Sequence, residues 1–305
     1  MFRNLKILSD IKWLMGKMSF KVRRPSEDIL EIYEDDELVA RYLYGRHLFK
    51  PYFYPLNTPG GLCVTEDGPS DHIHHRSMWT AHGDINGVDF WLERPESGKQ
   101  IVRTALAEVF NKCCKVSSDE RWVSRDNKPI VDVYREIVFW RRSGGWRFID
   151  VDIQFKASYS SLRFGDTKEG GTLSFRVAPS MRGVVGGVIR NSIGGLGEKE
   201  CWGKRAEWCD YTGPLGNSMA GITMFDHPDN PRHPTYWHVR EYGLFAANCF
   251  ALSYFLRDKS IDGSLTIRTG ETLRFRYRVL IHLGEIEAKT LNRLFEEYTE
   301  GAEPV

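Results

Sequence analysis

Several features that would place this sequence in a familiar class are missing. The 42 Lys and Arg residues nearly balance the 41 Asp and Glu residues, so the chain has no basic excess to attract nucleic acid or an anionic membrane. Even the longest uncharged stretches, such as residues 242–256, are too short to span a bilayer as a helix. Asp10 and Lys12 interrupt the start of the chain before an apolar core of signal-peptide length can form. These absences favour a soluble, cytoplasmic protein without nucleic acid or membrane partners.

Cysteine and the common catalytic motifs are also scarce. The six cysteines are too few and too irregularly spaced for a disulfide scaffold, and no CxxC pair signals a structural zinc site. The sequence has no GxSxG elbow, HExxH motif, Walker loop or GxGxxG motif. Serine-triad hydrolases, zinc metalloproteases and NTPases are therefore disfavoured, and no nucleotide cofactor is expected.

What the sequence does contain is a strong alternation of apolar and polar residues. Residues 149–155 and 273–281 alternate with a period of two, which predicts half-buried strands. Further strand-like runs lie at residues 29–33, 38–44, 101–110, 130–140, 172–177 and 221–225. Short Gly-containing turns between such runs favour antiparallel connections. The pattern predicts an all-β, mainly antiparallel fold.

One helix and one domain complete the expected architecture. Beyond Gly284, apolar residues recur at spacings of three and four from residue 291 to residue 298, which predicts a C-terminal helix packed on the sheet. Residues 1–17 carry a weaker amphipathic pattern and are expected to be a peripheral N-terminal extension. No internal repeat divides the rest, so residues 18–305 are expected to form a single catalytic domain.

Histidine is concentrated in two segments. Eight of the nine histidines fall within residues 47–93 and 224–245. Imidazoles are useful together as metal ligands or as acid–base pairs, so clustering is more informative than a single histidine. On an extended backbone, His72 and His74 would project to the same face. The alternative is that they bind backbone carbonyls in a Gly/Pro-rich loop.

The second histidine segment is rich in proline. Three prolines between residues 228 and 234 pre-set the backbone and lower the entropy cost of holding side chains in place. His238 and Arg240 alternate after Trp237 and are expected to face one side together. For His227 and His233, a structural turn held by an Asp–Arg pair is an equally good interpretation.

Two glutamates are candidates for a general base. Glu169 lies in a turn beside Lys168, and Glu207 precedes Trp208. A general base of this kind needs a carboxyl whose pKa is raised by partial burial, which aromatic neighbours can supply. A salt bridge to a nearby Lys or Arg is the alternative for each.

Together these patterns define the candidate residues. The catalytic candidates are His72, His74, His82, Glu169, Glu207 and His238. The candidates for substrate binding are Arg46, Tyr52, His75, Arg76, Trp79, Asp84, Lys168, Trp208, Asp226, His227, Trp237 and Arg240. His72, His74 and His238 are further expected to converge on one site, either as ligands of a divalent zinc, manganese or iron ion or as a metal-free trio acting through protonation.

Several longer motifs resemble a known family. They lie at residues 51–60, 71–76 with 82–84, 166–170, 208–211, and 226–234 with 237–245. Together they resemble the bacterial family labelled "methane oxygenase PmoA-like" over nearly all of residues 25–282. That label names a membrane protein, whereas this sequence has no segment long enough to span a bilayer. The resemblance implies instead a catabolic protein of sugars or polyols, with a β-sandwich similar to those of aldose mutarotases.

More narrowly, the chain resembles the hydrolases that open a keto-inositol ring to a keto-acid in myo-inositol catabolism. This resemblance implies a hydrolase with a small polar cyclic substrate, a cyclitol or a sugar, and a homo-oligomer is compatible with it. The alternatives are a sugar mutarotase or epimerase and a non-catalytic carbohydrate-binding protein. The abundance of titratable residues argues against a purely binding role, because sugar recognition alone rarely needs several imidazoles.

Overall fold

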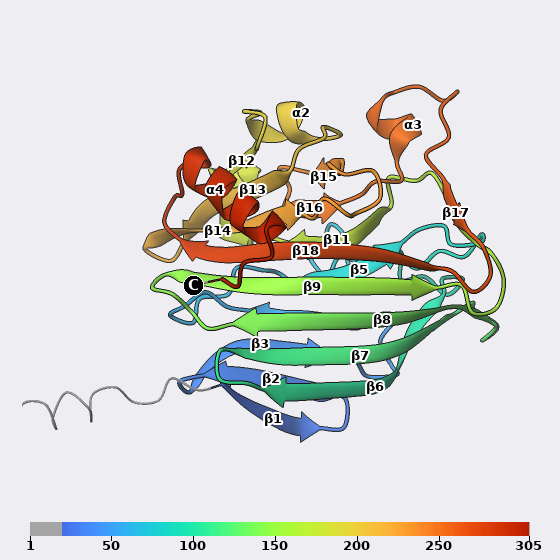
Figure 1. Cartoon of the computed structure of the whole chain (residues 1–305), viewed down its shortest axis with the longest axis horizontal. Helices are drawn as coiled ribbons and strands as arrows, with labels where there is room; N and C mark the ends of the chain where they lie inside the picture. The colour runs from blue at the N-terminus through green and yellow to red at the C-terminus, as the bar shows by residue number, and fades with distance from the viewer. Residues whose placement is uncertain (1–19, 305) are drawn as a thin grey trace, which may run out of the picture.

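The structure is a computed structural model that describes residues 20–304. The predicted extension at residues 1–17 lies outside the described residues. Two antiparallel eight-stranded sheets pack face to face (Figure 1). The strand orders are β1-β2-β3-β4-β5-β11-β16-β15 in the first sheet and β12-β13-β14-β18-β9-β8-β7-β6 in the second. The predicted all-β, mainly antiparallel sandwich is therefore confirmed.

The first sheet consists of β1 (Phe20–Ser26), β2 (Ile29–Glu34), β3 (Glu37–Leu43), β4 (Tyr52–Leu56), β5 (Met78–His82), β11 (Gly170–Arg176), β16 (Leu244–Ala247) and β15 (Trp237–Val239). The second consists of β12 (Val188–Asn191), β13 (Trp208–Leu215), β14 (Ser218–Asp226), β18 (Thr272–Leu283), β9 (Trp146–Lys156), β8 (Pro129–Trp140), β7 (Cys113–Val123) and β6 (Lys99–Val109). A small separate sheet pairs β10 (Leu162–Phe164) with β17 (Leu265–Ile267).

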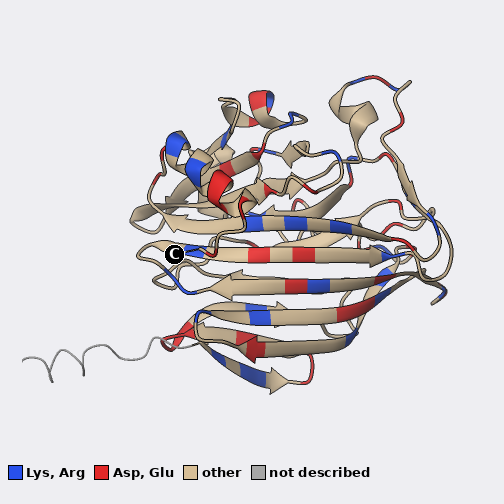
Figure 2. Ribbon diagram, viewed as in Figure 1, with Lys and Arg blue, Asp and Glu red and all other residues tan. Residues whose placement is uncertain are grey.

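The period-two alternation of β9 and β18 divides their side chains between the core and the outer face. The alternating apolar residues at 149–155 and 273–281 lie in the core between the sheets, to which both sheets contribute residues. Most of their charged residues face outward, where Arg278 pairs with Asp150 and Arg274 pairs with Asp152, while Arg147 of β9 points inward and pairs with Glu34 of β2. Figure 2 shows these as basic bands on β18 beside acidic bands on β9. The alternating pattern thus indicates on which face of the sheet each side chain lies.

The helices are short except for the last. They are α2 (Gly197–Cys201), α3 (Leu252–Phe255) and α4 (Ala288–Thr299), with 3-10 turns at Pro179–Met181 and Gly183–Val185. The apolar side of α4, formed by Leu291, Leu294, Phe295 and Tyr298, packs against Phe148, Leu280 and other residues of the second sheet. The predicted C-terminal helix is confirmed. Within residues 20–304, no helix has the length and apolar character needed to cross a membrane.

One row of residues crosses the outer face of the first sheet and positions the candidate site. His238 pairs with Ala246, Ala246 with Ser174, Ser174 with Trp79, and Trp79 with Tyr52. Residues directly opposite each other on neighbouring strands point to the same face. Residues 66–76 and 166–169 fold over this face, so strands that are distant in the sequence contribute to one surface.

Candidate functional site

The first histidine segment forms turns rather than a strand. The backbone N–H of His75 donates to the carbonyl of His72 at 2.9 Å, and that of His72 donates to Pro69 at 3.1 Å. The expectation of an extended backbone at His72 and His74 is therefore wrong. The turn still brings the two rings together, with centroids 5.8 Å apart.

The rings of this segment form one wall of the site. His75 stacks on Trp79 at 5.5 Å, His72 stacks on His75 at 4.6 Å, and Tyr242 stacks on His72 at 4.8 Å. Trp91 lies against His74 and Trp79, at centroid distances of 6.4 and 5.4 Å. This wall is aromatic on its faces and polar at its edges, which suits contact with a ring that carries hydroxyl groups.

A fully buried arginine holds the wall in place. Arg176 of β11 donates to both carboxylate oxygens of Asp71, at 2.8 and 2.7 Å, and its other nitrogen lies 3.3 Å from Nδ1 of His75. Burial lowers the pKa of His75, so its ring stays neutral and accepts this hydrogen bond at Nδ1. The proton of His75 is therefore on Nε2.

A buried lysine fixes the turn that carries His74. Lys50 donates to the carbonyls of Trp91 and His74, at 2.6 and 3.1 Å, and lies 3.3 Å from Glu93. Burial lowers the pKa of Lys50 to about 8, although the Glu93 carboxylate opposes the shift. Arg76 donates to the same Glu93, so Lys50 and Arg76 form one buried charge network under the wall.

Tyr52 and Arg76, both expected to bind substrate, belong to this supporting network. The Tyr52 hydroxyl donates to Asp67 at 2.9 Å, and the Arg76 guanidinium lies over the Tyr52 ring at 5.1 Å while pairing with Asp67. Their polar atoms are thus engaged with protein groups, and their geometric role is to position the wall.

Glu169 reaches the site because a glycine lets its loop pack closely. The N–H of Gly83, just after β5, donates to the Glu169 carbonyl at 2.7 Å. A Cβ at Gly83 would lie 2.6 Å from the same carbonyl oxygen, so a side chain there would displace the Glu169 backbone. The Lys168 ammonium lies 2.6 Å from the Glu169 carboxylate.

The Glu169 carboxylate interacts electrostatically with both His74, from the first histidine segment, and His238, from β15. Burial lowers the pKa of His74 and the pKa of His238 to about 4 each, and Glu169 opposes both shifts. Burial raises the pKa of Glu169, but Lys168 and the two histidines outweigh burial and hold this pKa below its usual range. The prediction of a raised pKa at Glu169 is therefore wrong. Near neutral pH the site holds two neutral imidazoles and one carboxylate.

Polar atoms without partners point to a ligand at this site. Within residues 20–304, Nε2 of His74 and Nδ1 of His238 have no hydrogen-bond partner. The same holds, in this part of the chain, for the indole nitrogens of Trp79 and Trp91 and the hydroxyl of Ser174, all nearly inaccessible to solvent. A buried unpaired polar atom costs about 1–3 kcal/mol, so such a cluster is expected where a ligand completes the hydrogen bonds.

The second histidine segment places some of its candidate residues in the site. His238 and Arg240 both lie on the outer face, since both contact the Trp202 ring, while Val239 between them and Trp237 before them point into the core. Arg240 also lies over Tyr242, at 5.6 Å. The structure therefore brings together His72, His74, His75, Trp79, Lys168, Glu169, His238 and Arg240, whose functional roles stay predictions.

Three of the candidate site residues from the first half of the chain lie outside the site. His82 points away from Trp79 toward Phe164 and Phe250, and its Nε2 lies 2.9 Å from the carbonyl of Gly165, so its assignment as a catalytic residue is corrected to a structural one. Asp84 accepts from the N–H of Gly87 in a turn and pairs with Arg163. Arg46 is exposed in the turn after β3, and no contact within the described chain joins it to the site.

Glu207, Trp208 and Trp237 are also placed outside the site. Glu207 is exposed, and its backbone N–H donates to Ser192. Trp208 lies under α4 and donates to Asn292 at 2.8 Å, and Trp237 is buried in the main core with its indole N–H bonded to Ala206. All three assignments are corrected.

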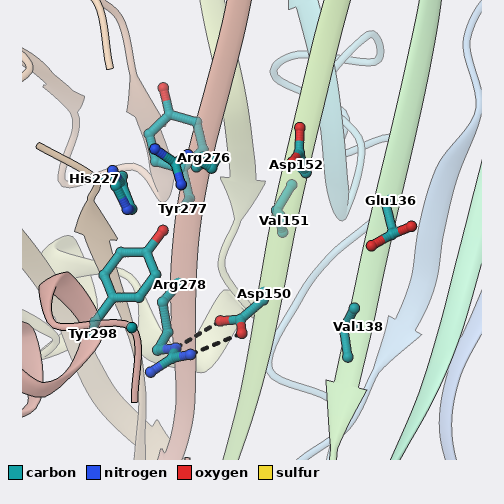
Figure 3. A pocket seen from close by; sticks show the side chains of 11 residues that line it. Glu136, Val138, Asp150, Val151, Asp152, His227, Arg276, Tyr277, Arg278 and Tyr298 are labelled. Carbon is teal, nitrogen blue, oxygen red and sulfur yellow. Dashed lines mark hydrogen bonds and ion pairs between the residues drawn. The ribbon is translucent and has the colours of Figure 1, made fainter. Parts of the chain in front are cut away.

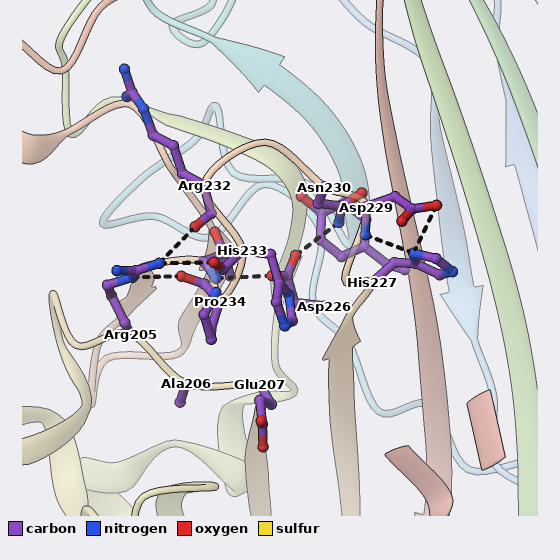
Figure 4. Close-up of polar contacts among 12 residues, drawn as sticks. Arg205, Ala206, Glu207, Asp226, His227, Asp229, Asn230, Arg232, His233 and Pro234 are labelled. Atoms are coloured by element: carbon purple, nitrogen blue, oxygen red, sulfur yellow. Dashed lines mark hydrogen bonds and ion pairs between the residues drawn. The ribbon is translucent and has the colours of Figure 1, made fainter. Parts of the chain in front are cut away.

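Asp226 and His227 hold the proline-rich loop instead of a substrate. Asp226 is fully buried and accepts from His233, Asn230 and the Thr235 N–H (Figure 4). His227 lies edge-on to Tyr298, beside a cavity of about 270 Å³ on the outer face of the second sheet. In that cavity Arg278 donates to both carboxylate oxygens of Asp150, so the two charges neutralise each other (Figure 3). Neither residue faces Glu169.

The expected metal ligands do not form a ready-made set. Among residues 20–304, no group of three or more His, Cys, Asp or Glu side chains is arranged to hold a metal ion. His74 and His238 interact electrostatically with Glu169, whereas the His72 ring lies against Asp71 and Tyr242. The metal role of His72, His74 and His238 stays a prediction, and the chemistry below is derived from protein groups.

Sequence analysis missed part of the site. Arg176, Ser174, Lys50, Tyr242 and Trp202 were not assigned to it. Ser174 and Arg176 alternate within the predicted strand at residues 172–177, so their shared face was available from the sequence. Which side of the sheet that face takes depends on pairing with β5 and β16, which no local pattern encodes.

Comparison with known proteins gives the family. Residues 30–296 match the "Family of unknown function (DUF6807)". The chain belongs to this family. A search of curated proteins gave no match. Among solved structures, the chain is similar to the GalM/aldose epimerase homologue from C. elegans, with 9% sequence identity and a TM-score of 0.34, covering 88% of this chain and 100% of that chain. The sequence identity and the TM-score are too low for this similarity to support a conclusion about the activity of the chain.

Proposed function

We propose that this DUF6807 protein is an isomerase that moves protons on a small polyhydroxylated ring, in the manner of a sugar mutarotase or epimerase. The observation that carries the proposal is a pair of neutral imidazoles, His74 and His238, which both interact electrostatically with the Glu169 carboxylate and each have a ring nitrogen without a partner within residues 20–304. A neutral imidazole with a free nitrogen is a proton acceptor, and the nearby carboxylate stabilises the imidazolium that results.

These groups account for the opening and closing of a cyclic hemiacetal. The free nitrogen of His238 accepts the proton of the hemiacetal hydroxyl, the ring C–O bond breaks, and the Lys168 ammonium donates a proton to the departing ring oxygen. After rotation of the open carbonyl form, the ring hydroxyl attacks the carbonyl carbon from the other face and gives its proton back to Lys168, while the His238 imidazolium donates its proton to the carbonyl oxygen. The indole N–H groups of Trp79 and Trp91 and the Ser174 hydroxyl are the donors available to the ring's oxygens.

The ring-opening hydrolase implied by the motif resemblance is the second candidate. The observation that favours it is the pair of cations, Lys168 and Arg240, whose charges both act on His238, because hydrolysis of a cyclic ketone builds an oxyanion that cations stabilise. Product mass separates the two reactions, since hydrolysis adds one water and isomerisation adds nothing.

Replacing His238 by Asn, or Glu169 by Gln, is expected to lower turnover by about 10²–10⁴-fold, the contribution of positioned acid–base groups. Turnover is measured on a panel of aldoses, keto-sugars and keto-inositols by NMR of anomeric exchange, with mass spectrometry of the products. Glu207→Gln is the matched control, because Glu207 is exposed and lies outside the site. Wild-type turnover in both site variants, or an equal loss in the control, would refute the assignment.

The pH dependence of kcat/KM provides an independent test. Because the pKa values of His74 and His238 are lowered to about 4, both imidazoles are already neutral at pH 5.5. We expect kcat/KM to be flat from pH 5.5 to 8, and to decline only as the pH approaches 4. An ordinary exposed histidine would instead produce an inflection near pH 6.5. Such an inflection, if lost in His238→Asn, would contradict the buried, neutral state of His238.

A further inference from the structure

An open cleft of about 960 Å³ borders the candidate site. Residues of α2 and α3 and the segment after β15 line it, and Figure 1 shows both short helices above β15 and β16. Trp202 and Phe255 line this cleft and also contact the His238 ring, at centroid distances of 6.4 and 6.2 Å. The cleft therefore leads from the side chains around His238 to the solvent.

The charges that line the cleft are unbalanced. Its cations are Lys199, Lys204, Arg240 and Arg257, and its carboxylates are Glu198 and Glu241. Arg240 pairs with Glu198 at 3.0 Å. Lys199, Lys204 and Arg257 are exposed, and none of them forms an ion pair with a carboxylate of residues 20–304. The cleft therefore has a positive potential that the protein itself does not neutralise.

Arg240 connects this cleft to the catalytic groups. Its guanidinium lies 6.0 Å from the Trp202 ring and 5.6 Å from the Tyr242 ring, so it is held between two aromatic faces. Its charge also contributes to lowering the pKa of His238. A ligand seated beside His238 would thus extend past Arg240 toward the unpaired cations.

We infer that the substrate carries an anionic group, a carboxylate or a phosphate, on its small polar ring. Lys199, Lys204 and Arg257 bind this group in the cleft, while the ring lies beside His238 and Glu169. The inference rests on the proposed function for the position of the ring. A neutral sugar would leave the three cations without a partner, whereas an anion is drawn to them and oriented by them.

The test is titration calorimetry at low ionic strength with four probes: D-glucose, D-glucuronate, D-glucose 6-phosphate and inorganic phosphate. We expect at least one acidic sugar to bind about tenfold or more tightly than glucose, and its binding to weaken with salt. Whichever acid binds more tightly identifies the group as carboxylate or phosphate. Acids that bind no more tightly than glucose, or no binding by any probe, would overturn the inference.

Charge reversal locates the anion. The double variant Lys199→Glu/Lys204→Glu is expected to weaken binding of the acidic sugar by about tenfold or more, since attraction becomes repulsion at short range. The matched control is Arg125→Glu/Lys128→Glu, which makes the same charge change on the exposed β7–β8 turn and should alter binding by less than about twofold. Equal weakening in both variants would show only a general charge effect and would refute this site.

The two proposals fail in different ways. If wild-type protein turns over no ring, yet the Lys199→Glu/Lys204→Glu variant alone loses acid binding, then the proposed isomerase function is wrong and the anion site stands. If turnover occurs equally well with neutral and acidic rings in wild type and in this variant, then the anion site is wrong and the isomerase stands.

Discussion

Glu120→Ala is expected to lower the free energy of unfolding by about 3–5 kcal/mol, the cost of leaving one partner of a buried ion pair uncompensated. Glu120 of β7 is fully buried and accepts from Arg135 of β8 at 2.6 Å. Arg135 is itself only 3% exposed and donates across the core to the Tyr42 hydroxyl of the other sheet at 3.0 Å. The pair therefore links the two layers of the sandwich.

Glu120→Ala would also remove hydrogen bonds other than the ion pair with Arg135. The same carboxylate accepts from the Ser118 hydroxyl at 2.7 Å and from the Trp122 indole at 3.0 Å. Without it, the Arg135 guanidinium and the Trp122 indole would be buried with unpaired donors in the apolar core. Replacing both charges, as in Glu120→Leu/Arg135→Met, should cost less than Glu120→Ala, because no uncompensated charge remains.

Denaturant unfolding measures these differences, and Glu136→Ala is the matched control. Glu136 lies on β8 next to Arg135 but faces outward, where it pairs loosely with Lys115 at 3.6 Å. An exposed pair of this kind contributes about 0–1 kcal/mol, so the control should remain near wild type. If Glu120→Ala lowered the free energy of unfolding by less than about 1 kcal/mol, the buried Glu120–Arg135 pair would not contribute to stability as we expect.

Stability is also expected to fall steeply between pH 6.5 and pH 5, by as much as about 4 kcal/mol per pH unit. Burial lowers the pKa of three buried histidines, His75, His82 and His238, the last two to about 4, and the pKa of the more exposed His74 is lowered in the same direction. In the unfolded chain these histidines titrate near 6.5. Between those values the unfolded chain binds more protons than the folded one, so acid favours unfolding. The stabilisation is complete above pH 6.5 and is lost as the pH falls toward 4.

Unfolding free energies at pH 5, 6, 7 and 8 test this expectation. Most carboxylates titrate near pH 4 in the unfolded chain, so the interval above pH 5 reports mainly on histidine. His82→Gln should reduce the slope by about one proton, about 1.4 kcal/mol per pH unit, while its amide can still donate to the Gly165 carbonyl. A stability that is unchanged from pH 7 to pH 5 would contradict the neutral state of the three rings.

Local patterns were sufficient where the physics is local. The alternation at residues 149–155 and 273–281 assigned β9 and β18 correctly, because each apolar side chain must face the core and its neighbours must face water. The amphipathic spacing after Gly284 identified α4 for the same reason. The concentration of histidine directed attention to the loop before β5 and to β15, whose functional role stays a prediction, although it could not separate His82 from His238.

Local patterns failed where two residues share the same local surroundings. Glu169 and Glu207 are both turn glutamates beside basic or aromatic residues, yet Glu169 interacts electrostatically with His74 and His238, whereas Glu207 is exposed outside the site. Trp79 and Trp237 are both strand tryptophans, yet one faces the site and the other the core. These differences arise from strand phase and from loops packing over the sheet, neither of which is visible within a short window.

By itself, the sequence determined the antiparallel sandwich, its last helix and the two segments that carry the histidines, because hydrophobic periodicity and composition act over a few residues. Only the tertiary structure decided which of those residues meet. His238, Ser174 and Trp79 share one face because β15, β16, β11 and β5 are neighbours in the sheet, although more than a hundred and fifty residues separate the outermost pair. The register between distant strands, and the burial that neutralises the imidazoles, exist only once both layers have packed.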